Sequence, residues 1–245
     1  MRVSDLIFQA RKASVLKTAC FLVFVLLISS DVAFAQKSSF KPEWNFGVNA
    51  GVTASSIDLE PHIQTKLMNG NTGGLSVRYI SEKNLGLQGE FNYSQQGFKE
   101  DFVETDSIYS YSRNLNYMEV PIMTHIYFGN KVRFVLNLGP KISFMTSNKE
   151  KMNTALSKLI ASGDTTTFSV YEHFGKSIQR KFDYGLIAGT GVEFRSGIGY
   201  FVLEARYYFG LGDIFNNSKK DYFSRSANRV LSFKLTYFIK PFGKK

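Results

Sequence analysis

The chain has 245 residues, and 30 lysines and arginines against 20 aspartates and glutamates give it a formal net charge of +10. Its single cysteine excludes an internal disulfide and a cysteine-based metal site. Beyond residue 35 no apolar run reaches the roughly 20 residues that a membrane-spanning helix needs.

The first 35 residues have the three parts of a signal peptide. A basic start is followed by a short apolar run over residues 19–28 and by Ala33-Phe34-Ala35, the small residues that signal peptidase requires. The basic residues are Arg2, Arg11, Lys12 and Lys17. The apolar run is too short for a membrane anchor, and Cys20 lies at its start and does not close it, unlike in a lipoprotein.

We therefore predict a signal peptide over residues 1–35, with cleavage after Ala35, and one mature domain over residues 36–245. Four basic and two acidic leader residues are lost, so the net charge falls by two, from +10 to +8. Cys20 is lost with them. No nucleic-acid partner is expected of an exported protein.

Eight later segments alternate apolar side chains with polar or small ones, which is the pattern of β-strands. Most exceed the roughly 9–11 residues of a tilted membrane-spanning strand. Closed barrels are accepted by bilayers because closure pairs every backbone polar group. We predict an all-β fold, an eight-stranded antiparallel transmembrane up-and-down β-barrel. The segments are Trp44–Thr53, Gly74–Ile80, Leu85–Gln95, Asn116–Phe128, Lys131–Met145, Asp183–Phe194, Tyr200–Leu211 and Arg229–Ile239.

Short and long connections alternate between these segments. The short ones are Ser81–Asn84, residues 129–130 and Arg195–Gly199, and the long ones cover residues 54–73, 96–115, 146–182 and 212–228. This alternation is typical of short periplasmic turns and long extracellular loops. A soluble lipocalin-like barrel is the structural rival, but it would turn its apolar face inward.

Aromatic residues on the apolar faces favour the membrane barrel. They gather in two girdles, as expected at the two membrane interfaces. One contains Trp44, Tyr79, Phe128, Phe194 and Phe201, and the other Tyr93, Phe144, Tyr184 and Phe209. We therefore expect location in the cell outer membrane, contact with its lipid and lipopolysaccharide, and insertion by barrel-assembly machinery that reads the aromatic C-terminal strand.

Several motifs resemble the PorT-like family of Bacteroidota outer-membrane β-barrel proteins. They are Phe91-Asn92-Tyr93-Ser94-Gln95-Gln96-Gly97, Asn116-Tyr117-Met118-Glu119-Val120-Pro121-Ile122, Leu138-Gly139-Pro140, Asp183–Phe194 and Glu204–Leu211. The resemblance implies the same fold and location over nearly the whole mature chain. It also implies one alternative function, an accessory role in type IX protein secretion. These are scaffold motifs, so the resemblance transfers no catalytic residue.

The polar faces of the segments carry five acidic and five basic residues. The interior of an eight-stranded barrel is only wide enough for side chains to fill it, and a buried charge without a partner costs several kcal/mol. We predict a lumen charge network that plugs the barrel, with a narrow gated conduit for small solutes as the alternative. Its members are Arg78, Glu90, Glu119, Arg133, Lys141, Asp183, Glu193, Glu204, Arg206 and Lys234.

Residues that could support catalysis are few. His62 and His173 fall in predicted loops, with Asp58, Asp164 and Ser169 near them in sequence, and such a set can activate a nucleophile. Three scattered histidines are unremarkable in a chain of this size, however. We expect no enzymatic activity and no cofactor.

The remaining candidates for metal binding are better explained by structural roles. We interpret His125 as an interior hydrogen-bonding residue, and no spacing matches a zinc site. The acidic run Glu100, Asp101, Glu104 and Asp106 lacks a calcium-loop pattern, so we predict solvated loop charge over weak binding of a divalent cation.

The third long loop contains a predicted helix. Ser147-Asn148-Lys149-Glu150 has the pattern of a capping box, and Ser162-Gly163 marks the end. Between them, apolar residues recur at helical spacing: Met152, Ala155, Leu156, Leu159 and Ile160. Two interpretations stay open, a helix that covers the barrel mouth and a docking element for a partner protein or lipopolysaccharide phosphates. The sequence thus favours a plugged barrel with a structural or surface-interaction role through its loops.

Overall fold

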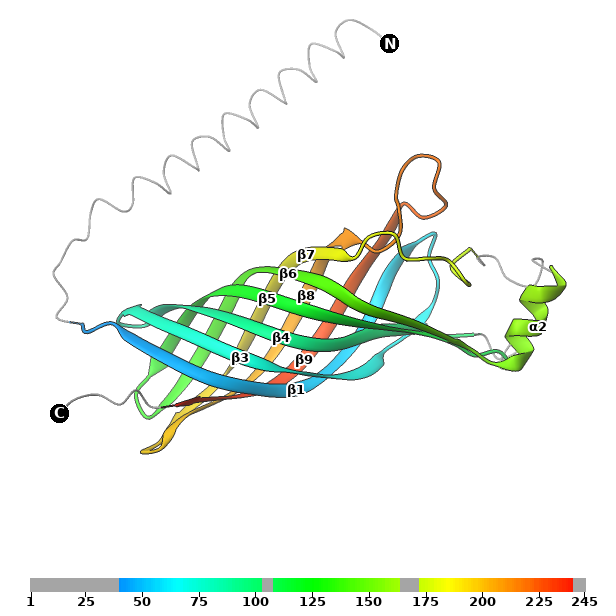
Figure 1. Cartoon of the computed structure of the whole chain (residues 1–245). Coiled ribbons are helices and arrows are strands. Elements are labelled where there is room, and N and C mark those ends of the chain that lie inside the picture. Colours follow the sequence, from blue (N-terminus) through cyan, green and yellow to red (C-terminus); the bar gives the residue numbers. More distant parts are fainter. Residues whose placement is uncertain (1–39, 103–107, 164–171, 240–245) are drawn as a thin grey trace, which may run out of the picture. The chain divides into compact units, whose positions relative to one another are not determined.

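The computed structural model describes residues 40–102, 108–163 and 172–239, and these residues form a β-barrel with one short helix (Figure 1). The predicted signal peptide lies outside them. The elements are β1 (Glu43–Glu60), β2 (Thr65–Lys66), β3 (Met68–Glu82), β4 (Leu85–Glu100), β5 (Tyr111–Gly129), β6 (Val132–Met152), α2 (Thr154–Ser162), β7 (Phe182–Arg195), β8 (Gly199–Asp213) and β9 (Arg225–Ile239). No helix in these three ranges is long and apolar enough to cross a membrane.

Eight of the strands close into an antiparallel ring. The order is β4-β3-β1-β9-β8-β7-β6-β5, and the additional β4–β5 pairing closes it. The two-residue strand β2 adds to the far end of β4, where Thr65 pairs with Glu100. The predicted eight-stranded up-and-down barrel is confirmed.

Tight turns join the strands at one end of the barrel. Two residues link β3 to β4, and Asn84 takes the left-handed backbone conformation there, with φ of 70°. Asparagine tolerates this conformation better than most residues. β5 and β6 are also joined by two residues, and β7 and β8 by three. We call this the short-turn end and the opposite end the long-loop end.

The strands at the long-loop end run well past their predicted limits. β1 continues to Glu60, β4 to Glu100 and β6 to Met152, and β3 begins at Met68. At this end the connections between ring strands are therefore residues 61–67, 101–110, 153–181 and 214–224. Each is shorter than the loop predicted for it, at 54–73, 96–115, 146–182 and 212–228 respectively. The physical reason is a reversal of polarity along the extended strands, which β1 shows most clearly.

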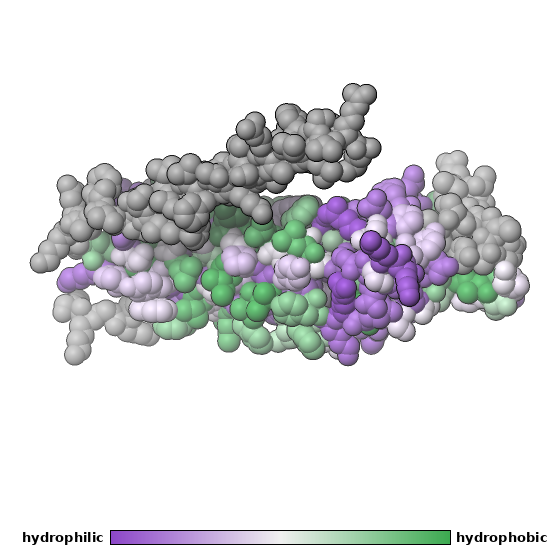
Figure 2. Space-filling model, turned by 90° about the horizontal axis from the view of Figure 1, so that it is seen from above, coloured by the Kyte–Doolittle hydropathy of each residue, from purple (hydrophilic) through white to green (hydrophobic). Residues whose placement is uncertain are grey.

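Two zones of opposite polarity divide the barrel. In the zone next to the short turns, apolar side chains such as Phe46 and Val48 face outward with over half of their surface exposed, while Asn45 and Asn49 are buried inside. Toward the long loops Ile57 and Leu59 are buried inside instead, and Asp58 faces out. We call the first zone the apolar band and the second the extension. Figure 2 shows hydrophobic residues along the band and hydrophilic residues over the extension.

The helix is shorter than predicted and begins later. Residues 147–152 are part of β6, where Ser147 faces Asn116 and Met152 faces Tyr111 on β5, so the predicted capping box is wrong. Asn153 caps the helix instead, and its side chain accepts a hydrogen bond of 3.1 Å from the Leu156 amide. Gly163 ends the helix in the left-handed conformation with φ of 74°, next to the predicted end.

Candidate functional site

The ten charged residues predicted to line the lumen all point inward and are no more than 9% exposed. They come from seven strands, and strand alternation turns their apolar neighbours toward the outside. Nine of them form ion pairs with one another. These pairs lie in successive clusters along the lumen.

The central cluster is built around Arg206 on β8. Its guanidinium binds both carboxylate oxygens of Glu90 on β4 at 2.8 and 2.9 Å, and it also binds Glu204 at 2.6 Å. Lys234 on β9 reaches Glu90 at 2.7 Å. Because two bases face two acids here, each buried charge is compensated across the width of the lumen.

A second cluster lies toward the short-turn end. Glu193 accepts from Arg78, and from Arg133 at 3.4 Å. His125 is fully buried beside Arg78, with its Nδ1 at 2.8 Å from the Asn137 side-chain oxygen, so it is an interior hydrogen-bonding residue as predicted. Apolar residues close the lumen at this level: Ile80, Tyr127, Val135, Tyr200, Val202 and Phe238.

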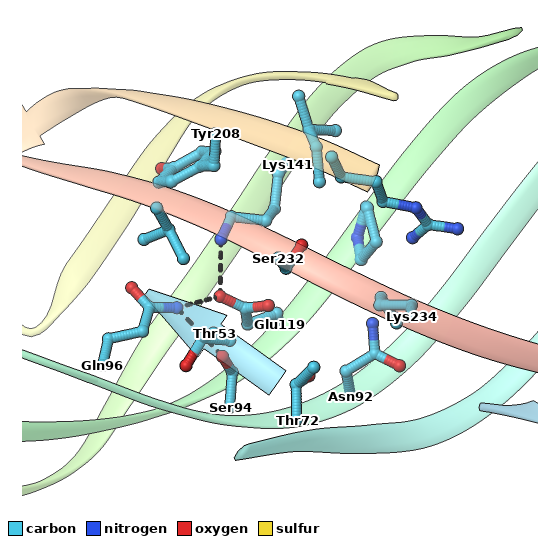
Figure 3. A pocket seen from close by; sticks show the side chains of 14 residues that line it. Thr53, Thr72, Asn92, Ser94, Gln96, Glu119, Lys141, Tyr208, Ser232 and Lys234 are labelled. Carbon is cyan, nitrogen blue, oxygen red and sulfur yellow. Dashed lines mark hydrogen bonds and ion pairs between the residues drawn. The ribbon is translucent and has the colours of Figure 1, made fainter. Parts of the chain in front are cut away.

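A third cluster lies toward the long-loop end, around a small cavity (Figure 3). Lys141 pairs with Glu119 at 2.5 Å, and its ammonium lies 3.5 Å from the centre of the Tyr208 ring. The cavity offers about 20 Å³, which is room for about one water molecule. This cavity is therefore too small for a solute larger than water.

Asp183 is the tenth residue of the predicted network. It accepts a hydrogen bond of 2.9 Å from the Asn228 side chain. No basic side chain of the described part of the chain lies within ion-pairing distance of it. The prediction that the charges pair five against five therefore does not extend to Asp183.

The extension has its own apolar core, which sequence reasoning missed. Twelve buried residues form it: Ile57, Leu59, Ile63, Phe98, Tyr111, Leu115, Tyr117, Met145, Leu156, Ile214, Phe215 and Phe223. Leu156 brings α2 into this core, and Phe215 and Phe223 bring in the connection between β8 and β9. The inverted alternation of Ile57 and Leu59 between Ser56, Asp58 and Glu60 was the signal that could have found it.

Polar contacts fix residues 173–175, in the connection between β6 and β7, to this core. His173 is fully buried, and its Nε2 lies 2.9 Å from Glu100. Tyr111 donates to Glu150 at 2.6 Å, and the Gly175 amide donates to the same oxygen. Burial of Tyr111, followed by its bond to Glu150, raises the pKa of its phenol.

Arg113 is a buried cation in the extension that the sequence analysis also missed. Its guanidinium donates to Asn148 at 2.8 Å and to the Lys176 carbonyl at 2.6 Å, and it lies 5.5 Å from the Phe215 ring. These contacts hold residues 173–176 against the inner face of β5.

Of the loop residues considered for catalysis, those that the structure describes are not brought together. Asp58 faces outward and pairs with Arg229 at 2.8 Å and with Arg225 at 3.1 Å, and His62 is exposed. Asp164 and Ser169 lie outside the described residues.

The two described residues of the acidic run have separate partners. Glu100 binds His173, and Asp101 pairs with Lys66 at 2.7 Å. Glu104 and Asp106 lie outside the described residues. Within the described ranges no three His, Cys, Asp or Glu side chains are grouped as metal ligands would be.

Comparison with known families adds the identity of the barrel. Residues 34–216 match the family described as outer membrane protein beta-barrel domain. The chain belongs to this family. Membership places the barrel in the outer membrane, with lipid around its apolar band. In outer-membrane barrels short turns face the periplasm and long loops face the outside, so the extension of this family member is extracellular.

Solved outer-membrane barrels are similar in fold to this family member. The attachment invasion locus protein Ail of Yersinia pestis is 16% identical, with 80% of this chain and 98% of Ail covered and a TM-score of 0.38. Neisserial surface protein A is 14% identical, with coverage of 78% and 96% and a TM-score of 0.40. The outer membrane enzyme PagL is 13% identical, with coverage of 79% and 98% and a TM-score of 0.35. No curated relative matches the sequence.

Proposed function

We propose that this outer-membrane barrel is a closed surface protein that acts through contacts made by its extracellular extension. The observation that carries the proposal is the combination of a filled lumen with a separately cored extension. The first leaves no route for solutes, and the second holds a shaped surface above the membrane. Neither catalysis nor a cofactor is part of the proposal.

The lumen supports this function because each of its levels is occupied. The apolar residues around Phe238 close the short-turn end, the Arg206 cluster fills the middle, and the extension core covers the other end. Between them the cavity beside Lys141 offers only about 20 Å³. A buried ion pair that loses one partner is strongly destabilised, so these clusters resist opening.

The extension supports the proposed contact function because β5 and β6 stay paired along their length and β6 leads directly into α2 (Figure 1). Lys149, Lys151 and Lys158 are exposed there, and Ile160 is 41% exposed although Leu156 is buried. Exposed apolar and basic side chains on a preordered support lower the entropic cost of binding a partner protein. Contact with acidic groups, lipopolysaccharide phosphates included, is compatible with the same surface.

Two experiments test the proposal, one on the purified full barrel in planar bilayers and one on the protein in intact cells. We expect no steady single-channel steps, whereas sizeable regular steps would replace the proposal by the small-solute channel. On cells, a photo-crosslinker at Lys158 should yield a discrete adduct that Ile160→Asp removes. A crosslinker at Lys83, in a periplasmic turn, serves as the control. Absence of any adduct at Lys158 contradicts a contact function.

The resemblance to PorT-like proteins implies a role in secretion, and this role stays a prediction. Crosslinking on cells, combined with a deletion strain, tests it. In a deletion strain, retention of secreted cargo inside the cell would favour the accessory role. Normal secretion together with a lost surface adduct would favour the contact function.

A further inference from the structure

The apolar band is interrupted on the outer face of β1, β3 and β4. Three exposed amide residues, Asn69, Asn71 and Gln95, stand where the alternation puts lipid-facing side chains. Within the described chain their side chains make no hydrogen bond to other residues. Amides in such positions favour a ligand that can donate and accept hydrogen bonds.

Strand register places these amides next to residues of the band. Asn71 faces Val52, which in turn faces Phe233 on β9, and both apolar side chains are half exposed. Asn69 likewise faces Ala54, which faces Leu231. The amides therefore adjoin the outermost lipid-facing residues, at the extracellular edge of the band.

The extracellular aromatic girdle has members on β4, β6, β7 and β8. They are Tyr93, Phe144, Phe182, Tyr184 and Phe209, which are exposed near the extracellular edge of the band. On β1 and β3 the corresponding outward positions hold Ala54, Asn69 and Asn71, so the extracellular aromatic girdle has a gap there.

The gap forms a hollow of about 520 Å³ on the outer surface. Its lining residues are Val52, Thr53, Ala54, Asn69, Gly70, Asn71, Gln95 and Phe233, and none of the eight is charged. This volume lies within the roughly 300–1,000 Å³ typical of small-molecule sites. The hollow is amphipathic, with Val52 and Phe233 on one part of its wall and the three amides on the other.

We propose that this hollow binds the sugar head of an outer-leaflet glycolipid, with the acyl chains lying along the band. Sugar hydroxyls and acyl amides match the hydrogen-bonding capacity of Asn69, Asn71 and Gln95, and Val52 and Phe233 contact the chains. Because no cation lines the hollow, recognition depends on the sugar and its amides and not on phosphate. The inference rests on the membrane location alone and is independent of the contact function proposed above.

The test measures glycolipid retained by the full barrel in detergent, using native mass spectrometry. The probes are rough lipopolysaccharide, its dephosphorylated form and phosphatidylglycerol. We expect the first two to be retained and phosphatidylglycerol not. The combined variant Asn69→Leu/Asn71→Leu/Gln95→Leu should retain roughly tenfold less of both glycolipids, as expected from two or three lost hydrogen bonds.

Matched controls separate binding from folding. Thr124→Leu replaces another exposed lipid-facing polar residue, on β5, and should leave retention unchanged. Heat-modified migration on gels checks that each variant barrel is folded. The proposal is wrong if the combined variant keeps full retention of both glycolipids, or if the unchanged barrel retains phosphatidylglycerol as well as it retains them.

A second copy of the chain is the competing occupant. Asn71→Cys in a Cys20→Ser background would then give a disulfide-linked dimer in membranes. Such a dimer, abolished by Gln95→Leu, would overturn the glycolipid site. A monomer under these conditions supports it.

Discussion

The same strand follows opposite rules in the two zones of the molecule. In the apolar band β1 turns Val48 and Val52 toward lipid and buries Asn49, while in the extension it buries Ile57 and Leu59 and turns Asp58 outward. The two-residue period is unbroken between them, so no bulge in β1 produces the change. What changes is the medium outside, because a lumen surrounded by lipid is polar, whereas an extension surrounded by water needs an apolar core.

This difference teaches that the two zones are stabilised by different interactions. Compensated charges hold the lumen together, and their removal leaves other charges without partners in a dry interior. Hydrophobic packing holds the extension, as in a soluble domain, and its loss affects that zone first.

Replacing Arg206 should break the band zone most severely. Arg206→Leu leaves Glu90 with Lys234 alone and leaves Glu204 without a cation, so we expect a loss of about 3–5 kcal/mol in the free energy of unfolding. Urea unfolding from lipid vesicles measures it. Lys66→Ala breaks the exposed pair with Asp101 and should cost at most about 1 kcal/mol. Equal effects of the two variants would contradict a lumen held by buried pairs.

Truncating an aromatic residue in the extension should act locally. Phe223 is fully buried and stacks on Phe215 with ring centres 5.3 Å apart. Phe223→Ala should weaken that core by about 3–5 kcal/mol. We expect faster trypsin cleavage at Lys219 and Lys220 on intact cells, while heat-modified migration of the barrel is retained. Loss of the folded barrel itself would show that the zones are not separable.

A lysine scan along one face of β1 should locate the boundary between the zones. Val48→Lys puts a charge against lipid and should cost about 2–4 kcal/mol, whereas Ser56→Lys, eight residues on and facing the same side, should cost about 0–1 kcal/mol. Refolding into vesicles with urea titration gives both values. A large cost at Ser56 would place the membrane edge farther out than the polarity change.

The smallest expected effect is a pH response in the last connection. The Ser218 hydroxyl donates to Asp221 at 2.5 Å and holds the pKa of that carboxyl below its ordinary value. A lowered folded pKa favours this turn above the unfolded pKa, and the benefit is lost as the pH falls through the folded value. Ser218→Ala should return the pKa of Asp221 toward the ordinary value in a carboxyl NMR titration. Because Asp221 is fully exposed to solvent, the benefit lost at neutral pH should be too small to change the unfolding of the barrel measurably.

Sequence reasoning succeeded where one rule applies along the whole strand. Within the band, alternation assigned inward and outward residues correctly, from Trp44 outside to Lys234 inside. It therefore predicted the ring of eight strands and the inward direction of the lumen charges. It did not predict which charges meet, because Arg206 and Glu90 are 116 residues apart and their contact depends on register around the ring.

It failed where the rule reverses. Sequence reasoning predicts a loop at Ser56, Asp58 and Glu60 because polar side chains on the outward face indicate the end of a membrane strand. The capping-box pattern at Ser147 failed for a related reason, since backbone pairing with β5 outweighs a local helix signal. Contacts such as His173 with Glu100 depend on how the connections fold over the core, and no local pattern encodes them.

The filled lumen has a consequence for the cell that makes this protein. An open pore raises the permeability of the outer membrane with every copy, so its abundance is limited by the toxic compounds that it admits. A barrel that is closed as proposed, with Arg206, Glu90 and Lys141 in its interior, would impose no such limit. On that proposal the cell could carry many copies while its outer membrane stays impermeable to antibiotics and detergents.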